Sequence, residues 1–223
     1  MPGEVTLAHR GVLFLDELPE FSKQALETLR EPLSIGRVSI SRAARSCTFP
    51  ARFQLIAAMN PCPCGYLTDP QRECLCSPRQ ISGYQQKISG PLLDRIDLHL
   101  SVPRLTPDEL DQGPTGEDSL LVRARVLTAR ARQAQRITRG KGHLNAHMTQ
   151  AQLREFCPLD AEGRKLLRQA VERFSLSARG YDKILRIGRT LADLDASDTI
   201  TVTHVAEAIH YRHPPESKNA NGG

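Results

Sequence analysis

The stretch GVLFLDELPEF, residues 11–21, runs four apolar residues directly into two carboxylates. Residues 11–16 read as a short, buried strand, and an apolar run without alternation is typical of a parallel sheet that is covered on both faces. Asp16 and Glu17 then stand at the carboxyl end of this strand, where open α/β sheets bind their ligands. The stretch therefore predicts an α/β fold with a site at the end of this strand.

Two adjacent carboxylates at a strand end suit nucleotide hydrolysis. One carboxylate can hold Mg²⁺, usually through bound water, and a second group beside the γ-phosphate can orient the attacking water. Asp16 and Glu17 supply both groups, in the arrangement known as Walker B. The pattern alone is weak evidence, because a strand that ends in an acidic, solvated turn is common.

Composition narrows the class of protein. The 223 residues are 39% hydrophobic, which suffices for one large domain or two small ones with a buried core. The formal net charge of +5 makes a polyanion a partner to test. No apolar run reaches membrane-spanning length and the N-terminus does not read as a signal peptide, so we expect a soluble, cytoplasmic protein.

The predicted elements fall into two parts. After the first strand we expect a helix capped by Ser22 and disturbed at Pro32, a hairpin, and a second apolar strand that ends on Asn60. Ser77 and Pro78 begin a further helix, and a strand is expected at residues 96–102. The remaining segments are a Pro-, Gly- and acid-rich linker at residues 103–118, helices over residues 119–212 and a disordered tail at residues 213–223.

Four of the six cysteines share one loop, as Cys62, Cys64, Cys74 and Cys76. Without a secretory signal, this spacing favours a metal site or reduced thiols over disulfides. Four thiolates could form a tetrahedral, structural zinc site, and the alternative is free thiols in a flexible loop. Cys47 and Cys157 are isolated and read as ordinary thiols.

Taken in order, these segments resemble the AAA+ ATPases, and specifically the magnesium-chelatase-related branch of YifB/ComM type. GVLFLDELPEF, AAMNPCPCGY, ISGPLLDRIDLHLSVP and SARGYDKILRIGRTLADL all look like that family. The resemblance covers residues 2–212, and four motifs in order are far more specific than one. It implies a partial AAA+ α/β core over residues 1–102, from Walker B to the arginine finger, and an all-α lid domain over residues 119–212.

The resemblance also implies roles for single residues. Asp16 would help to hold Mg²⁺ and Glu17 would polarise the attacking water. Asn60 would be sensor 1, Arg95 the arginine finger that reaches the nucleotide of the next subunit, and Arg179 the phosphate-contacting sensor 2. Each of these last three residues also has a simpler interpretation. Asn60 could cap a turn at the strand end, and Arg95 could form a salt bridge with Asp94 or Asp97. Arg179 could be a solvated arginine at a helix end.

The tip of the predicted hairpin carries Arg42 and Arg45. In the family, a hairpin at this position projects into the central pore of a hexamer. Arginines there would hold a DNA backbone through phosphate contacts without reading bases. The alternative is a solvated turn, because charge alone rarely identifies a site.

The sequence departs from the family in one respect, because it has no GxxxxGK[ST] loop for the phosphates. We therefore expect a C-terminal part of a longer ATP- and Mg²⁺-dependent ATPase, with weak or absent ATP binding and hydrolysis of its own. Three functions stay open: a DNA motor of helicase or branch-migration type, a magnesium-chelatase-type subunit that drives metal insertion into a porphyrin, and a non-enzymatic zinc-bearing binding module.

Overall fold

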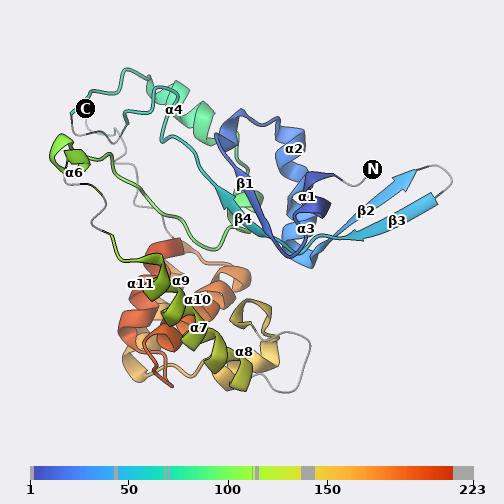
Figure 1. Cartoon of the computed structure of the whole chain (residues 1–223), viewed down its shortest axis with the longest axis vertical. Coiled ribbons are helices and arrows are strands. Elements are labelled where there is room, and N and C mark those ends of the chain that lie inside the picture. Colours follow the sequence, from blue (N-terminus) through green and yellow to red (C-terminus); the bar gives the residue numbers. More distant parts are fainter. Residues whose placement is uncertain are drawn as a thin grey trace. The chain divides into compact units, whose positions relative to one another are not determined.

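A computed structural model describes residues 3–42, 45–67, 69, 71–111, 113, 116–136 and 144–212. The chain divides into two compact units, of which the first runs to Ile96 and the second starts at Asp97 (Figure 1). The first unit mixes helices and strands, and the second is helical. The disordered tail expected at residues 213–223 lies outside the described residues.

The first unit is built around two parallel strands. β1 (Val12–Leu15) pairs with β4 (Gln54–Ala57), and Leu15 lies opposite Ala57. Leu13 and Leu15 pack against a core that is closed by the segments after β1 and by residues near α5. The buried members of this core are Leu18, Leu26, Leu29, Ile88 and Leu92.

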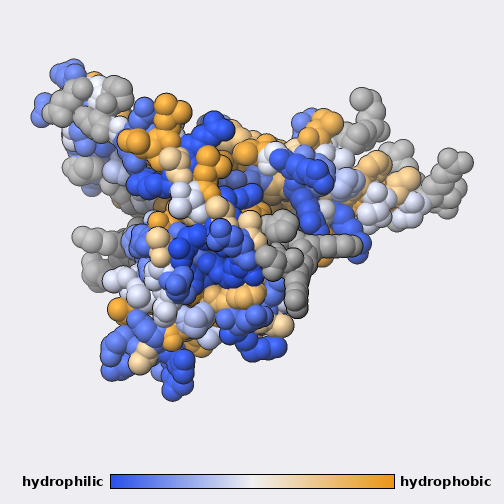
Figure 2. Space-filling model, turned by 60° about the horizontal axis from the view of Figure 1, so that its bottom comes forward, coloured by the Kyte–Doolittle hydropathy of each residue, from blue (hydrophilic) through white to orange (hydrophobic). Residues whose placement is uncertain are grey.

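The other face of this sheet is exposed, so the expectation of a sheet covered on both faces is wrong for the described residues. Val12 and Phe14 are 55% and 59% exposed, and Ile56 is 44% exposed. Hydrophobic residues also stand at several places on the surface in Figure 2. Side chains alternate between the two faces of a strand, so Leu13 and Leu15 reach the core while Val12 and Phe14 stay in contact with solvent.

The first unit also contains several short helices. Ser22 caps a helix as predicted, since its Oγ accepts a hydrogen bond from the Ala25 N–H at 3.2 Å. Pro32 has no N–H to donate within a helix, and the chain forms two short helices rather than one longer one. They are α2 (Lys23–Thr28) and α3 (Arg30–Ile35), preceded by α1 (Glu4–Leu7) and the 3₁₀ helix η1 (Leu18–Glu20).

The predicted hairpin is confirmed. β2 (Arg37–Arg42) and β3 (Arg45–Pro50) are antiparallel, with Arg37 opposite Pro50 and Arg42 opposite Arg45. In Figure 1 the hairpin extends away from β1 and β4. Residues 43 and 44, between the strands, lie outside the described residues.

Two helices follow the cysteine loop. α4 (Pro78–Gln85) begins with the capping box of Ser77 and Gln80, and α5 (Gly90–Leu93) follows it. The strand expected at residues 96–102 is not present, because no described strand lies beside this segment to complete its hydrogen bonds. Leu100 and Val102 are accordingly 71% and 88% exposed.

The second unit packs its helices around one core. Leu153, Leu167, Ile184 and Val205 are almost fully buried there. Residues 103–118, expected as a linker, include the short helix α6 in their described part. The elements are α6 (Pro107–Asp111), α7 (Ser119–Arg136), η2 (Asn145–His147), α8 (Gln150–Phe156), α9 (Ala161–Phe174), α10 (Ala178–Leu194) and α11 (Val202–Arg212).

A buried ionic network joins three elements of this unit. Asp193 of α10 accepts hydrogen bonds from Arg136 of α7 at 3.0 Å and from Asn145 of η2 at 2.9 Å. Arg189 also lies 3.2 Å from Asp193 and donates to the Asp198 carbonyl at 2.6 Å. Arg189 and Asp193 are each 1% exposed, so the network is part of the core. In the part of the chain that the structure describes, we find no helix with the length and apolarity needed to cross a membrane.

Candidate functional site

Asp16 and Glu17 follow β1 and Asn60 follows β4, so all three lie beyond the carboxyl ends of the two parallel strands, at the same edge of the sheet. Beyond the paired strands, the Ala58 N–H donates to the Leu15 carbonyl at 2.9 Å, and the Leu18 N–H donates to the Ala58 carbonyl at 2.9 Å. These two hydrogen bonds flank the Asp16–Glu17 turn and tie it to the segment that leads to Asn60. Parallel pairing therefore brings together three of the predicted site residues, which come from separate parts of the sequence.

The turn after β1 has an unusual backbone conformation. Glu17 lies in the left-handed region, with φ +49° and ψ +47°, which costs a residue with a side chain about 1–2 kcal/mol. Its N–H donates to Asp16 Oδ1 at 2.9 Å, so the first carboxylate stabilises the turn that presents the second. Both side chains are exposed at the strand end. Such backbone outliers concentrate at functional sites.

Tyr84 of α4 lies beside this strand end and is 7% exposed. Burial raises its pKa, as does the negative charge of Glu20 and Glu17, while a hydrogen bond from the backbone of Asn60 opposes the rise. Tyr84 is therefore a neutral, buried contact of the Asn60 segment. The sequence predicts a helix that begins at Ser77 and Pro78, but it contains no signal for the contact of Tyr84 with Asn60.

The four loop cysteines gather at one point. The Sγ atom of Cys62 lies 3.4 Å from that of Cys64 and 3.7 Å from that of Cys74, and Cys64 and Cys74 are 3.6 Å apart. All four Sγ atoms, including that of Cys76, lie within 4.8 Å of one another. With Zn–S bonds of about 2.3 Å, the edges of a tetrahedral thiolate site are about 3.8 Å long. The cluster thus has the size and the donor set of such a site.

The cysteine cluster also favours one negative charge. A hydrogen bond from the backbone of Tyr66 lowers the pKa of the Cys64 thiol to about 6. Cys74 receives an opposing hydrogen bond from the backbone of Cys76, but burial and its contacts with Cys64 raise its pKa to about 12. A thiolate surrounded by further sulfur donors is a favourable ligand set for a soft metal cation.

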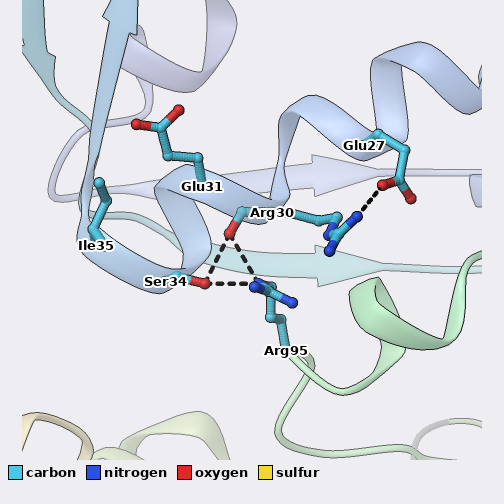
Figure 3. A pocket seen from close by; sticks show the side chains of 6 residues that line it. All are labelled: Glu27, Arg30, Glu31, Ser34, Ile35 and Arg95. Carbon is cyan, nitrogen blue, oxygen red and sulfur yellow. Dashed lines mark hydrogen bonds and ion pairs between the residues drawn. The ribbon is translucent and has the colours of Figure 1, made fainter.

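Arg95 follows α5 and contacts α3 (Figure 3). Its Nε donates to the Arg30 carbonyl at 2.9 Å and to Ser34 Oγ at 2.6 Å, and its Nη1 donates to the Pro91 carbonyl at 2.6 Å. These three acceptors are neutral. Asp97, considered as a salt-bridge partner for Arg95, lies 2.7 Å from Lys183 Nζ within the second unit.

The other predicted arginines belong to other elements of the chain, α10 and the hairpin β2–β3. Arg179 is exposed in the first turn of α10, after Ser177, whose Oγ accepts a hydrogen bond from the Gly180 N–H at 3.1 Å. Arg179 belongs to the second unit. The backbone of Arg42 and Arg45 is part of the hairpin, but their side chains lie outside what the structure describes.

Comparison with known proteins identifies the family. The model for magnesium chelatase, subunit ChlI, matches residues 1–110, and the model for the C-terminal part of the same subunit matches residues 116–212. The two matches cover almost all of the chain in the order expected for one family. This chain therefore belongs to the magnesium-chelatase-like family.

Individual relatives agree with this assignment. The chain is 44% identical over 212 residues to the uncharacterized protein YifB of Escherichia coli, covering 95% of this chain and 41% of the relative. It is also 44% identical over 212 residues to the competence protein ComM of Haemophilus influenzae, covering 95% and 40%. The identity to the chloroplastic magnesium-chelatase subunit ChlI of Oryza sativa is 24% over 214 residues, covering 93% and 44%. The chain spans about two fifths of the length of these curated relatives.

Proposed function

We propose that this chain is the water-activating and phosphate-sensing part of an ATP-driven motor that acts on DNA. The observation that carries this proposal is the meeting of the Asp16–Glu17 turn with the Asn60 segment at the end of the parallel pair β1–β4. In this function Asp16 helps to hold Mg²⁺ through bound water. Glu17 polarises the attacking water, and Asn60 orients that water or contacts the γ-phosphate.

Two arginines complete the proposed ATPase. Arg95 acts as the arginine finger toward the nucleotide of a neighbouring subunit in a homo-oligomer, which we expect to be a hexamer. Its guanidinium donates to two oxygens of α3 and to the Pro91 carbonyl of α5. Arg179, near the start of α10, acts as sensor 2 from a helical lid. In both roles the cation offsets the charge that develops on the transferred phosphoryl group.

The DNA part of the proposal rests on the hairpin β2–β3. It is a two-stranded arm with an arginine at each side of its tip, Arg42 and Arg45. Arginines presented by such an arm bind a phosphate backbone without base specificity. The pI near 9.0 is compatible with a polyanionic partner.

A magnesium-chelatase role is the second candidate, because the matching family models carry that description. The identities weigh against it, since the chain is 44% identical to a competence protein and 24% identical to a magnesium-chelatase subunit. The two candidates share the ATPase chemistry and differ in the macromolecule or substrate on which the motor acts. Binding to DNA separates them.

DNA binding is measured by fluorescence anisotropy with a labelled duplex across a series of salt concentrations. Replacing Arg42 and Arg45 together by Ala should weaken binding and reduce the slope of log Kobs against log salt by about 1.8, since each lost phosphate contact contributes about 0.9. The matched control replaces Arg164 and Arg168, two exposed arginines of α9. Equal losses in both double variants, or no DNA binding at all, would overturn the DNA role.

ATP hydrolysis by the chain tests whether it can act on the nucleotide without a GxxxxGK[ST] loop, and any hydrolysis found then tests the role of Glu17. We expect no hydrolysis above background with or without DNA, because these 223 residues contain no GxxxxGK[ST] loop. Hydrolysis that disappears in Glu17→Gln would support the role of Glu17 and show that another segment holds the phosphates. Hydrolysis that survives in Glu17→Gln would contradict the proposed role.

We further propose that the four-cysteine cluster holds one structural zinc ion. The support is the arrangement of four Sγ atoms within 4.8 Å of one another, at distances suited to a tetrahedral site. All four positions would be filled by protein ligands, so zinc would stabilise the loop and leave no position for substrate. Zinc binding without any response to DNA or nucleotide would favour the zinc-bearing binding module over the motor.

A further inference from the structure

The cysteine loop begins and ends beside the candidate site. Cys62 and Cys64 follow Asn60 by two and four residues, and Cys76 directly precedes Ser77, which caps α4. A metal bound to all four cysteines would therefore join the segment that leaves β4 to the start of α4. The metal would thus tie together the two ends of the cysteine loop, one of which follows β4 and the other of which precedes α4.

α4 then returns to the point where the loop begins. Gln85 Nε2 donates to the Pro61 carbonyl at 3.1 Å, and the side chain of buried Tyr84 lies beside the backbone of Asn60. Just beyond α4, Lys87 Nζ lies 3.4 Å from Glu20 Oε1, in the helix that follows the Asp16–Glu17 turn. α4 and the residue Lys87 just after it thus contact the segments that follow β1 and β4.

Asn60 also contacts the other side of the loop. Gly65 has a φ of +82° and donates its N–H to the Cys62 carbonyl at 3.0 Å, which makes a tight turn between the first two cysteines. A Cβ atom placed on Gly65 would lie 4.0 Å from Asn60 Cγ. The Asn60 side chain therefore lies against the Cys62–Gly65 turn, while its backbone contacts α4.

We propose that zinc bound by the four cysteines locks α4 against Asn60, so that the metal positions Asn60 at the end of β4. This inference rests on the zinc site proposed above and assigns it a second consequence beyond loop stability. Cys62 and Cys64 restrain Asn60 through the turn, and Cys74 and Cys76 restrain it through α4. Tyr84 and Gln85 are positioning residues, because they act on the Asn60 segment rather than on a reacting group.

The first experiment measures zinc in the purified full chain by elemental analysis, beside a Cys74→Ser/Cys76→Ser double variant. The expected result is one zinc per chain and its loss in the double variant. The matched control is Cys47→Ser, because Cys47 is an exposed thiol outside the cluster. Absence of zinc from the parent chain, together with failure to bind added Zn²⁺ or Co²⁺, would overturn the zinc site and this inference with it.

The second experiment follows amide hydrogen exchange in the zinc-loaded chain and after zinc removal by a chelator. Exchange should rise by about tenfold or more in peptides that cover residues 58–62 and 81–86, because local opening no longer breaks metal bonds. Peptides from α9 and α10 should not change, which shows that the second unit stays folded. Unchanged exchange at residues 58–62 after zinc loss would leave the zinc site standing and overturn the positioning role.

A third variant distinguishes the effect of zinc binding from the effect of the contact between α4 and Pro61. Gln85→Ala removes the hydrogen bond to the Pro61 carbonyl but no cysteine. We expect the zinc content of this variant to stay at one per chain and exchange at residues 58–62 to rise severalfold. Zinc content and exchange that both match the parent chain would show that α4 does not transmit the restraint.

Discussion

At the scale of single residues, the backbone conformation of Glu17 shapes the turn at the candidate site. Its left-handed φ of +49° turns the chain sharply at the end of β1, and the Asp16 carboxylate holds that turn through the Glu17 N–H. Left-handed backbone is unfavourable for most residues with a side chain, and Asn tolerates it better than Gln or Glu. The protein thus carries a conformational cost at the residue that we propose to activate water.

This conformational cost predicts that two substitutions of Glu17 differ in their effect on stability. Glu17→Asn should unfold with a free energy about 0.5–1 kcal/mol higher than Glu17→Gln, since Asn adopts the left-handed region more readily. Urea denaturation of both variants, followed by a probe in the first unit, measures the difference. Equal stability would show that the turn is not strained.

Cys157 predicts a pH dependence of the second unit. Burial raises the pKa of its thiol from 9.0 to about 11. The folded chain keeps the proton longer than the unfolded chain, so stability that is complete below pH 9 is lost as the pH rises toward 11. The loss attributable to this thiol is roughly 2–3 kcal/mol. Denaturation of the parent chain and Cys157→Ala between pH 8 and pH 11 measures it, because the variant should show a shallower decline; parallel declines would contradict this origin.

At the scale of elements, α4 depends on its start. The Ser77 side chain and the Gln80 side chain each accept a hydrogen bond from the backbone of the other residue, which satisfies two N–H groups at the helix end. The same eight-residue helix carries Tyr84 and Gln85, which contact the Asn60 segment. A short helix of this kind is stable only with such caps and contacts.

Removal of this cap should therefore loosen the helix. Ser77→Ala is expected to cost about 1 kcal/mol, and thermal denaturation with amide exchange over residues 78–86 measures the effect. Ser82→Ala is the matched control on the same helix, because Ser82 Oγ accepts a hydrogen bond from the exposed Gln86 side chain rather than from a backbone N–H at the helix start. A cost that is equal in the two variants would argue against the cap as the origin.

At the scale of the whole molecule, the two units have different sources of stability. The first has a small core and an uncovered sheet face. The second combines a larger apolar core with the buried network of Asp193, Arg189 and Arg136. A buried carboxylate between two arginines is favourable only while all three charges remain paired.

Asp193→Ala should therefore destabilise the second unit by about 3–5 kcal/mol, because it leaves two arginines without their buried carboxylate. Unfolding of the chain should then separate into two transitions, with the second unit melting first. Glu117→Ala is the control: it removes the exposed Arg125–Glu117 pair, and we expect a loss below about 1 kcal/mol. Unchanged stability of Asp193→Ala would show that the network contributes little.

The sequence by itself determined the elements whose signals are local and the family to which the chain belongs. The apolar run before Asp16, the caps at Ser22 and Ser77, the hairpin and the spacing of the four cysteines were all readable, because each depends on neighbouring residues. The same logic failed for residues 96–102 and for the uncovered face of β1, because strands and sheet faces depend on partners that a local pattern does not reveal.

The tertiary structure alone decided which distant residues meet. Parallel pairing placed Asn60 at the edge that carries Asp16 and Glu17, α3 supplied the acceptors for Arg95, and α4 brought Tyr84 back to Asn60. These contacts join segments far apart in the chain, and they arise from packing and backbone pairing rather than from residue type. Motif spacing can therefore nominate the members of a site, whereas only the folded chain shows what holds each of them in place.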